Sequence, residues 1–196
     1  VMPGDVVPTE MNFELPSGFN PQRDDLIILN TIATNRWKRP ICFTSPQVGM
    51  GLQEFLRREG LTYRLTPIQA NGAPDTDWMM NVLMTKFKNG NADKKGVYYD
   101  ETNRAHLATP QGIRQAFADL AQDLNSKNRK DDAKKLLAKC ESLVPGDNVP
   151  YGMASRRESH NYTSYLLMQA AYDAGATDIA AKISKQLNKD LNQQAD

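Results

Sequence analysis

The strongest chemical signal in the chain is a tryptophan among cations in residues 35–40, Asn-Arg-Trp-Lys-Arg-Pro. An indole face can stack on a sugar ring, and a guanidinium can pair with a carboxylate or a phosphate. Two further residues of a strand-like stretch, Tyr63 and Arg64, are expected to lie beside this segment. The candidate binding residues are therefore Asn35, Trp37, Arg39, Tyr63 and Arg64. The alternative is that Trp37 anchors the core and that the neighbouring cations are solvated.

Other reactive side chains do not assemble into a catalytic motif. His106 and His160 are far apart in the chain, and neither belongs to an H-x3-H spacing that would suit a metal. No G-x-S-x-G stretch presents a serine nucleophile, and the turn at residues 49–51 lacks the lysine of a phosphate-binding loop. We therefore expect no catalytic residue, no metal and no cofactor, and we expect that this chain alone is not an enzyme. A small hydrolase is the weakest alternative, which a nucleophile and a base within hydrogen-bond reach would revive.

Clusters of like charge have simpler explanations. The pairs Asp24-Asp25 and Asp131-Asp132 fall in the opening turns of predicted helices, where negative charge complements the helix dipole. Arg156-Arg157 and His160 form a second candidate patch that could contact a partner.

Composition limits the classes of function. The chain has 196 residues, of which 40% are hydrophobic, and this is enough for a core that needs no disulfide or metal to stabilise it. A net charge of +1 argues against a nucleic-acid partner, which calls for a basic excess. No apolar run approaches the roughly 20 residues that span a bilayer, so we expect no direct membrane insertion of this fragment. The opening residues do not resemble a signal peptide, and the abrupt start suggests an excised piece of a longer protein.

The chain has two cysteines, Cys42 and Cys140, too few for a disulfide framework. Both lie in apolar surroundings, and we expect both thiols to be buried and unreactive.

The N-terminal half alternates between strand-like and helix-like stretches. Residues 20–35 begin with Asn-Pro, a typical helix start, and carry an expected buried stripe of Leu26, Leu29, Ile32 and Ala33. The expected strands are residues 11–15, 41–44 and 61–66, with 97–99 as a weaker candidate. The expected helices are residues 51–59, closed by Gly60, and a stretch from residue 75 or 76 to about residue 88, after a turn at 71–74.

The C-terminal half has the spacing of tetratricopeptide units. Small and large apolar residues recur on that pattern from Phe117 to Leu137, and Pro145 follows as a stop. The expected helices are residues 110–126, 130–143, 159–174 and 178–191, with a polar tail at 188–196 that should fray. Asn128 is expected in a left-handed turn between the first two helices.

These elements predict an α+β fold that is mainly helical. A small mixed β-sheet in the N-terminal half should pack on a tetratricopeptide-like helical C-terminal half. The expected regions are residues 1–105 and 106–196, together forming one compact body.

The same residues also carry a family resemblance. Residues 35–43, 59–68, 84–91 and 96–101 resemble the C-terminal region of a bacterial multi-spanning membrane-protein family of unknown function. The membrane part of that family resembles protein O-mannosyltransferases, and the family likewise ends in helical repeats. The resemblance covers about residues 25–187 and transfers no catalytic residue, since the catalytic loops lie between membrane helices. Cys42 departs from the family, which often has an aromatic residue there, and the segment with Arg156-Arg157 has no evident counterpart.

The resemblance implies a domain on the periplasmic side of the bacterial inner membrane. We expect it to act as a non-catalytic accessory domain of a membrane glycosyltransferase-like protein. Its expected partners are an acceptor polypeptide or glycan and its own membrane-embedded N-terminal part. The alternative is an independent tetratricopeptide-type scaffold that binds a peptide in its concave face.

Overall fold

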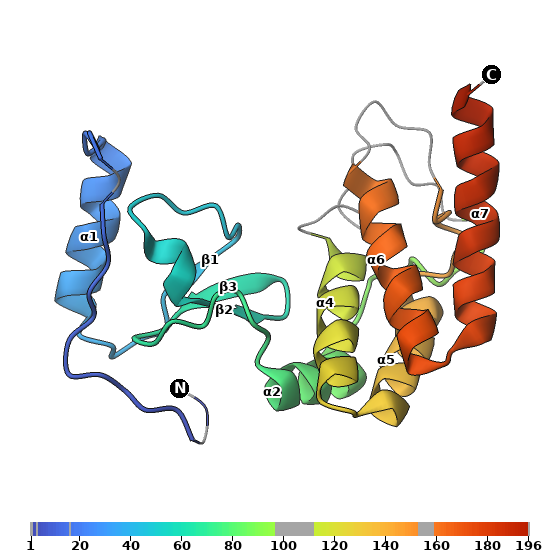
Figure 1. Cartoon of the computed structure of the whole chain (residues 1–196), viewed down its shortest axis with the longest axis horizontal. Helices are drawn as coiled ribbons and strands as arrows, with labels where there is room; N and C mark the ends of the chain where they lie inside the picture. Colours follow the sequence, from blue (N-terminus) through green and yellow to red (C-terminus); the bar gives the residue numbers. More distant parts are fainter. Residues whose placement is uncertain (1, 3, 16, 97–111, 153–158, 196) are drawn as a thin grey trace. The chain divides into compact units, whose positions relative to one another are not determined.

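The computed structural model describes residues 2, 4–15, 17–96, 112–152 and 159–195, which form two compact units, Val1–Asp75 and Thr76–Asp196 (Figure 1). Helices predominate and a small sheet accompanies them, so the predicted α+β class is confirmed. The boundary expected after residue 105, the candidate strand at 97–99, His106 and Arg156-Arg157 lie outside the described residues.

The sheet of the N-terminal unit has the order β1-β3-β2, with β1 at Cys42–Phe43, β2 at Leu56–Glu59 and β3 at Thr62–Leu65. Both strand pairings are antiparallel, whereas we expected a mixed sheet. For β2 and β3 the reason is the two-residue turn at 60–61, in which Gly60 has a φ of 63°. A tight turn of this kind joins antiparallel strands, because parallel strands need a long crossover.

The stretch expected as one helix at 51–59 is two elements, a 3-10 turn at Leu52–Phe55 and the strand β2. Its apolar residues Leu52, Phe55 and Leu56 are buried as expected. The carbonyl of Phe55 accepts hydrogen bonds from the amide of Thr66 at 2.9 Å and from its hydroxyl at 3.0 Å. Hydrogen bonds to residues later in the sequence therefore replace the local helical hydrogen bonds in this stretch.

The outer edge of β2 is covered by residues 71–75. The amide of Gly72 donates to Leu56, the amide of Arg58 donates to Ala73, and the amide of Asp75 donates back to Arg58. Pro74 forms an isolated parallel bridge with Arg58. The expected turn at 71–74 is thus confirmed, with Asn71 at a φ of 50° and Gly72 at 75°.

Helix α1 spans Arg23–Asn35, and its first turn is closed by the Asp25 carboxylate, which accepts a hydrogen bond from the Gln22 amide at 2.9 Å. Ile28, Leu29 and Ile32 pack against the core of this unit, whereas Leu26 is 54% exposed. The expected stripe was thus wrong at Leu26 and at Ala33, which is also exposed, because the helix turns Ile28 inward together with Leu29 and Ile32.

Residues 11–15 form no strand, contrary to expectation. Met11 and Phe13 nevertheless pack against the core of the N-terminal unit. The alternating pattern therefore corresponds to an extended segment that turns apolar side chains inward but does not pair with a strand.

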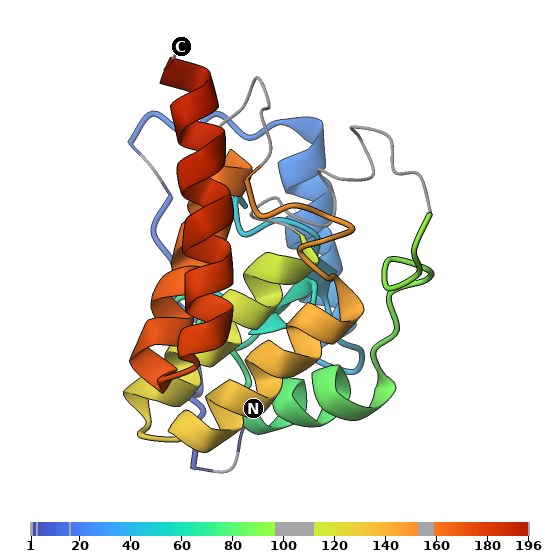
Figure 2. The same cartoon turned by 90° about the vertical axis from the view of Figure 1, so that its right-hand side faces the viewer.

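The C-terminal unit begins with α2 at Thr76–Asn81, which continues as the π-helical turn η2 at Val82–Lys86. The four long helices are α4 at Ile113–Ser126, α5 at Lys130–Leu143, α6 at Ser159–Ala174 and α7 at Thr177–Ala195. The helix α4 contacts α5 and α6, and α6 also contacts α5 and α7, so each helix pair lies against the next (Figure 2). Asn128 joins α4 to α5 with a φ of 59°, as expected.

Helix α7 runs to Ala195, so the tail from 188 does not fray as we expected. Leu187 and Asp190 are buried, and the Asp190 carboxylate accepts a hydrogen bond from the side-chain Nδ2 of Asn161 at 3.1 Å. These contacts with α6 extend the helix beyond its last apolar repeat position.

A buried arginine holds the segment that follows α5. Arg114 of α4 is fully buried, and its guanidinium lies 4.0 Å from the ring centre of Tyr151. It donates to the carbonyls of Val144 and Pro150, each at 3.1 Å, and to that of Val149. The Tyr151 hydroxyl in turn donates to Glu141, which pairs with Lys182 at 2.7 Å. The guanidinium thus supplies the donors that these buried carbonyls require.

We expect Arg114→Met to lower the free energy of unfolding by about 3 kcal/mol or more, because it leaves several buried carbonyls without donors. Urea denaturation followed by circular dichroism measures this. The exposed Lys135→Met serves as the control and should cost less than about 0.5 kcal/mol. A loss for Arg114→Met that equals the control would contradict the structural role given to the guanidinium.

The two cysteines differ in environment. Both are free, and Cys140 is buried on α5, where burial raises the pKa of its thiol to about 12. Cys42 is exposed, so the expectation that both thiols are buried was wrong for this residue. In the short strand β1 only Phe43 turns toward the core, and the alternation of the strand leaves Cys42 on the other face.

We expect iodoacetamide to modify Cys42 in the native protein and to spare Cys140 until the protein unfolds. The reason is that the reagent needs an accessible thiolate, which burial denies to Cys140. Mass spectrometry of peptides from native and urea-treated protein reads out both sites. Equal labelling of the two cysteines in native protein would contradict the buried position.

Candidate functional site

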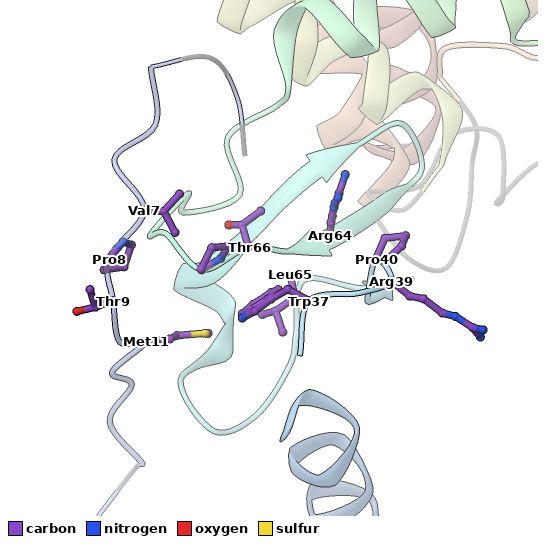
Figure 3. Close-up of a pocket in the computed structure, with 11 residues that line it drawn as sticks. Val7, Pro8, Thr9, Met11, Trp37, Arg39, Pro40, Arg64, Leu65 and Thr66 are labelled. Atoms are coloured by element: carbon purple, nitrogen blue, oxygen red, sulfur yellow. The ribbon is translucent and has the colours of Figure 1, made fainter. Parts of the chain in front are cut away.

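The N-terminal unit contains a hollow with a volume of about 400 Å³ (Figure 3). Three stretches of chain form its walls: an N-terminal segment, the loop after α1 and the end of β3. The residues that line it are Val7, Pro8, Thr9, Met11, Trp37, Arg39, Pro40, Arg64, Leu65, Thr66 and Pro67. Three of the five candidate binding residues therefore meet in one place.

The loop after α1 has an unusual backbone that presents the tryptophan. Arg36 and Trp37 adopt the left-handed region consecutively, with φ of 49° and 58°. The Asn35 side chain closes the loop on both sides, since its amide group donates to the Arg39 carbonyl at 2.8 Å and its oxygen accepts from the Arg39 amide at 2.9 Å. Two such residues in sequence are unfavourable unless the surroundings hold them. Asn35 thus acts through the backbone and does not itself line the hollow.

Trp37 is not a core anchor, because its side chain is 48% exposed. Figure 3 shows the indole inside the hollow and Met11 extending toward it from the N-terminal segment. An accessible aromatic face beside apolar walls is the arrangement on which a sugar ring or another flat apolar face stacks.

The charged groups of the hollow are all cationic. Arg39 and Arg64 line it, and no carboxylate is among its lining residues. Arg64 is 39% exposed at its side chain and pairs with Glu59 at 3.2 Å, a carboxylate on the neighbouring strand. The charge of Arg64 is thus partly compensated, while Figure 3 shows Arg39 extending outward from the loop. The hollow favours neutral or anionic ligands over cations.

Tyr63 lies on the other face of the sheet. It is buried, its hydroxyl accepts a hydrogen bond from Arg58 at 2.6 Å, and its ring lies 5.1 Å from the Arg58 guanidinium carbon. Because side chains alternate along a strand, Arg64 and Tyr63 point to opposite faces of β3. Only Arg64 reaches the hollow.

The N-terminal wall was not expected from the sequence. Its anchor is Asp5, whose carboxylate pairs with Arg57 of β2 at 3.0 Å. The hydrogen bond from Arg57, and next the one from the backbone of Met2, hold the pKa of Asp5 below its ordinary value. Residues 7–11 follow directly and carry no motif that would mark them as lining a site.

Within the described ranges, no group of three or more histidine, cysteine or acidic side chains is placed to hold a metal ion. The hollow itself offers two guanidiniums and the hydroxyls of Thr9 and Thr66 as its polar side chains. Thr66 already donates to Phe55 at 3.0 Å. Together with the indole, these groups can stack on a ligand, donate hydrogen bonds to it and attract negative charge.

We expect Asn35→Ala to loosen the loop and to move Trp37 into water. The loss of two hydrogen bonds to Arg39 should cost about 1–2 kcal/mol of stability and shift the Trp37 fluorescence to longer wavelength. A Trp78→Phe background isolates the Trp37 signal. Asn30→Ala, on an exposed position of the same helix, is the matched control and should leave the emission unchanged. Unchanged emission in Asn35→Ala would mean that the loop holds its shape without this side chain.

Among the described residues, no helix has both the length and the apolar character needed to cross a bilayer. No curated protein and no solved structure matches the chain. Residues 2–87, which include every residue of the hollow, match the family model described as TMEM260-associated domain 2. The match ends before the four long helices, and bacterial origin and tetratricopeptide repeats form no part of it. Residues 2–87 are thus similar to a domain associated with TMEM260, a protein O-mannosyltransferase-like protein.

Proposed function

We propose that this chain is a non-catalytic accessory domain of a membrane glycosyltransferase-like protein, and that it binds the glycan of an acceptor in the hollow of its N-terminal unit. The observation that carries the proposal is a half-exposed tryptophan, Trp37, in a hollow with apolar walls that Arg39 and Arg64 also line. Carbohydrates offer apolar ring faces for stacking together with hydroxyls that accept hydrogen bonds from guanidinium groups.

The dimensions support a small ligand. A volume of about 400 Å³ falls in the range of roughly 300–1,000 Å³ typical of small-molecule sites. The walls come from three separate stretches of chain, so the aromatic and cationic residues that line the hollow are brought together by the fold of this unit. A sugar at the end of a glycan or on a polypeptide would enter such a hollow, whereas a folded surface would not.

The chemistry of the lining supports a binding role without catalysis. Glycosyl transfer and hydrolysis call on carboxylates that donate and accept protons, and an arginine stays charged at accessible pH. The hollow has arginines and no carboxylate, so its groups can position a ligand but are poorly suited to move a proton.

The parent and the location follow from similarity. The match of residues 2–87 to a TMEM260-associated domain supports a membrane-embedded partner region in the same protein. The resemblance to a bacterial family supports a place on the periplasmic side of the inner membrane, where the domain would meet acceptors beside the transferase.

A second function, a scaffold that binds a peptide, rests on helix α6. Tyr162, Tyr165 and Tyr172 of this helix are exposed, at 60%, 48% and 51%. Their spacing of three and seven residues puts them along one face of the helix. Exposed tyrosines in a row are common in protein interfaces.

We expect Trp37→Ala to weaken binding of the best ligand from a glycan array at least about tenfold, because the stacking face is lost. Calorimetry with the purified protein measures the affinity. Trp78→Ala is the matched control, since Trp78 is 44% exposed and lies outside the hollow, and it should bind as the wild type does.

Two outcomes would contradict the glycan proposal. One is glycan binding that survives Trp37→Ala, and the other is an equal loss in both tryptophan variants. The scaffold would be favoured by a different result with unfolded peptides. Their binding would disappear when the three exposed tyrosines of α6 are replaced by serine, and it would persist in Trp37→Ala.

A further inference from the structure

Two arginines lie side by side on the sheet at the border of the hollow. In the register of β2 and β3, Arg57 is directly opposite Arg64. Residues opposite each other in an antiparallel pair project to the same face, with Cβ atoms about 4.5–5.5 Å apart. Arg64 lines the hollow, so Arg57 adjoins it across one strand.

Arg57 is unusually placed for a cation. Only 3% of the residue is exposed, and its guanidinium pairs with Asp5 through Nη1 at 3.0 Å. Its Nε is buried and has no hydrogen-bond partner among the described residues. A guanidinium recognises a carboxylate or a phosphate best when two of its nitrogens donate in parallel. Arg57 therefore holds an unused donor next to an anion that it binds through a single oxygen.

The anion comes from the wall of the hollow itself. Asp5 lies two residues before Val7, the first residue of that wall, and its Oδ2 also accepts a hydrogen bond from the Met2 amide. Movement of the Asp5 carboxylate would thus move the N-terminal side of the hollow.

We propose that Arg57 and Arg64 form an anion-binding subsite beside the hollow, and that Asp5 fills it as an internal ligand which a sugar bearing a phosphate or a carboxylate displaces. This inference rests on the proposed function, because it names the class of sugar that the same hollow takes.

Charge explains why the exchange is selective. This face of the sheet carries Arg57 and Arg64 against Asp5 and Glu59, so departure of Asp5 leaves an excess of positive charge. A buried guanidinium without a counter-charge is costly, and Asp5 therefore leaves only when another anion arrives. A neutral sugar can enter the hollow but cannot replace the Asp5 carboxylate.

The test compares glucose 6-phosphate, glucose and inorganic phosphate as probes, with Trp37 fluorescence in a Trp78→Phe background as the readout. In Asp5→Asn the internal competitor is weakened, so affinity for glucose 6-phosphate should rise about tenfold while affinity for glucose stays the same. Inorganic phosphate should also bind more tightly to this variant. An Asp5→Asn protein with unchanged or weaker affinity for both phosphate probes would overturn the proposal.

A second variant guards against misfolding of Asp5→Asn. Arg64→Gln keeps the Asp5–Arg57 pair, and the side chain that it replaces is partly exposed. It should lose the preference for glucose 6-phosphate over glucose, whereas Arg23→Gln, outside the hollow, should keep it. A preference that survives Arg64→Gln would also overturn the proposal.

The outcome for glucose separates this inference from the proposed function. The double variant Asp5→Asn, Trp37→Ala lacks the stacking face, and calorimetry can measure its binding of inorganic phosphate. Phosphate binding by this variant would support the anion subsite even if sugar stacking fails. Glucose binding that depends on Trp37 but ignores Asp5 and Arg64 supports the proposed function and rejects the subsite.

Discussion

The antiparallel pairing of β2 with β3 is the constraint on which the hollow depends. It sets Leu56 opposite Leu65 on one face of the sheet, where Arg58 and Tyr63 are also buried, and Arg57 opposite Arg64 on the other. A shift of the register by one residue would turn every side chain of a strand to the other face. Arg57 and Arg64 would then leave the face that borders the hollow. The geometry of the site and the stability of this unit are therefore set by the same row of backbone hydrogen bonds.

Two of the three arginines that are buried in the described part of the chain meet the cost of burying a charge in different ways. Arg114 donates to several backbone carbonyls and lies over the ring of Tyr151, so its partners are parts of the scaffold that cannot leave. Arg57 depends on the carboxylate of Asp5, which belongs to a segment with no regular secondary structure. The first arrangement makes a permanent support, whereas the second can be exchanged for another anion. Burial alone does not distinguish them, but the nature of the acceptor does.

Local sequence signals predicted the helices well and the site only in part. The bounds of α5 and α6, at residues 130–143 and 159–174, follow from apolar periodicity and helix stops and match the structure. The sequence also singled out Trp37, because an aromatic among cations is recognisable without a fold. The error at residues 51–59 arose because strand pairing with distant residues replaced local helical bonds. The wall at residues 7–11 is held by an ion pair across the sequence, which no local pattern reveals.

The closure of the sheet edges has a consequence for how other chains can associate with this unit. Residues 71–75 occupy the outer edge of β2, and Pro74 has no amide hydrogen to offer an incoming strand. The opposite edge is β1, which is two residues long. An edge strand of that length is too short for an extended peptide to pair with it. Such strand addition is the basis of both β-augmentation and edge-to-edge aggregation. The unit can therefore work close to unfolded polypeptides without incorporating them into its sheet.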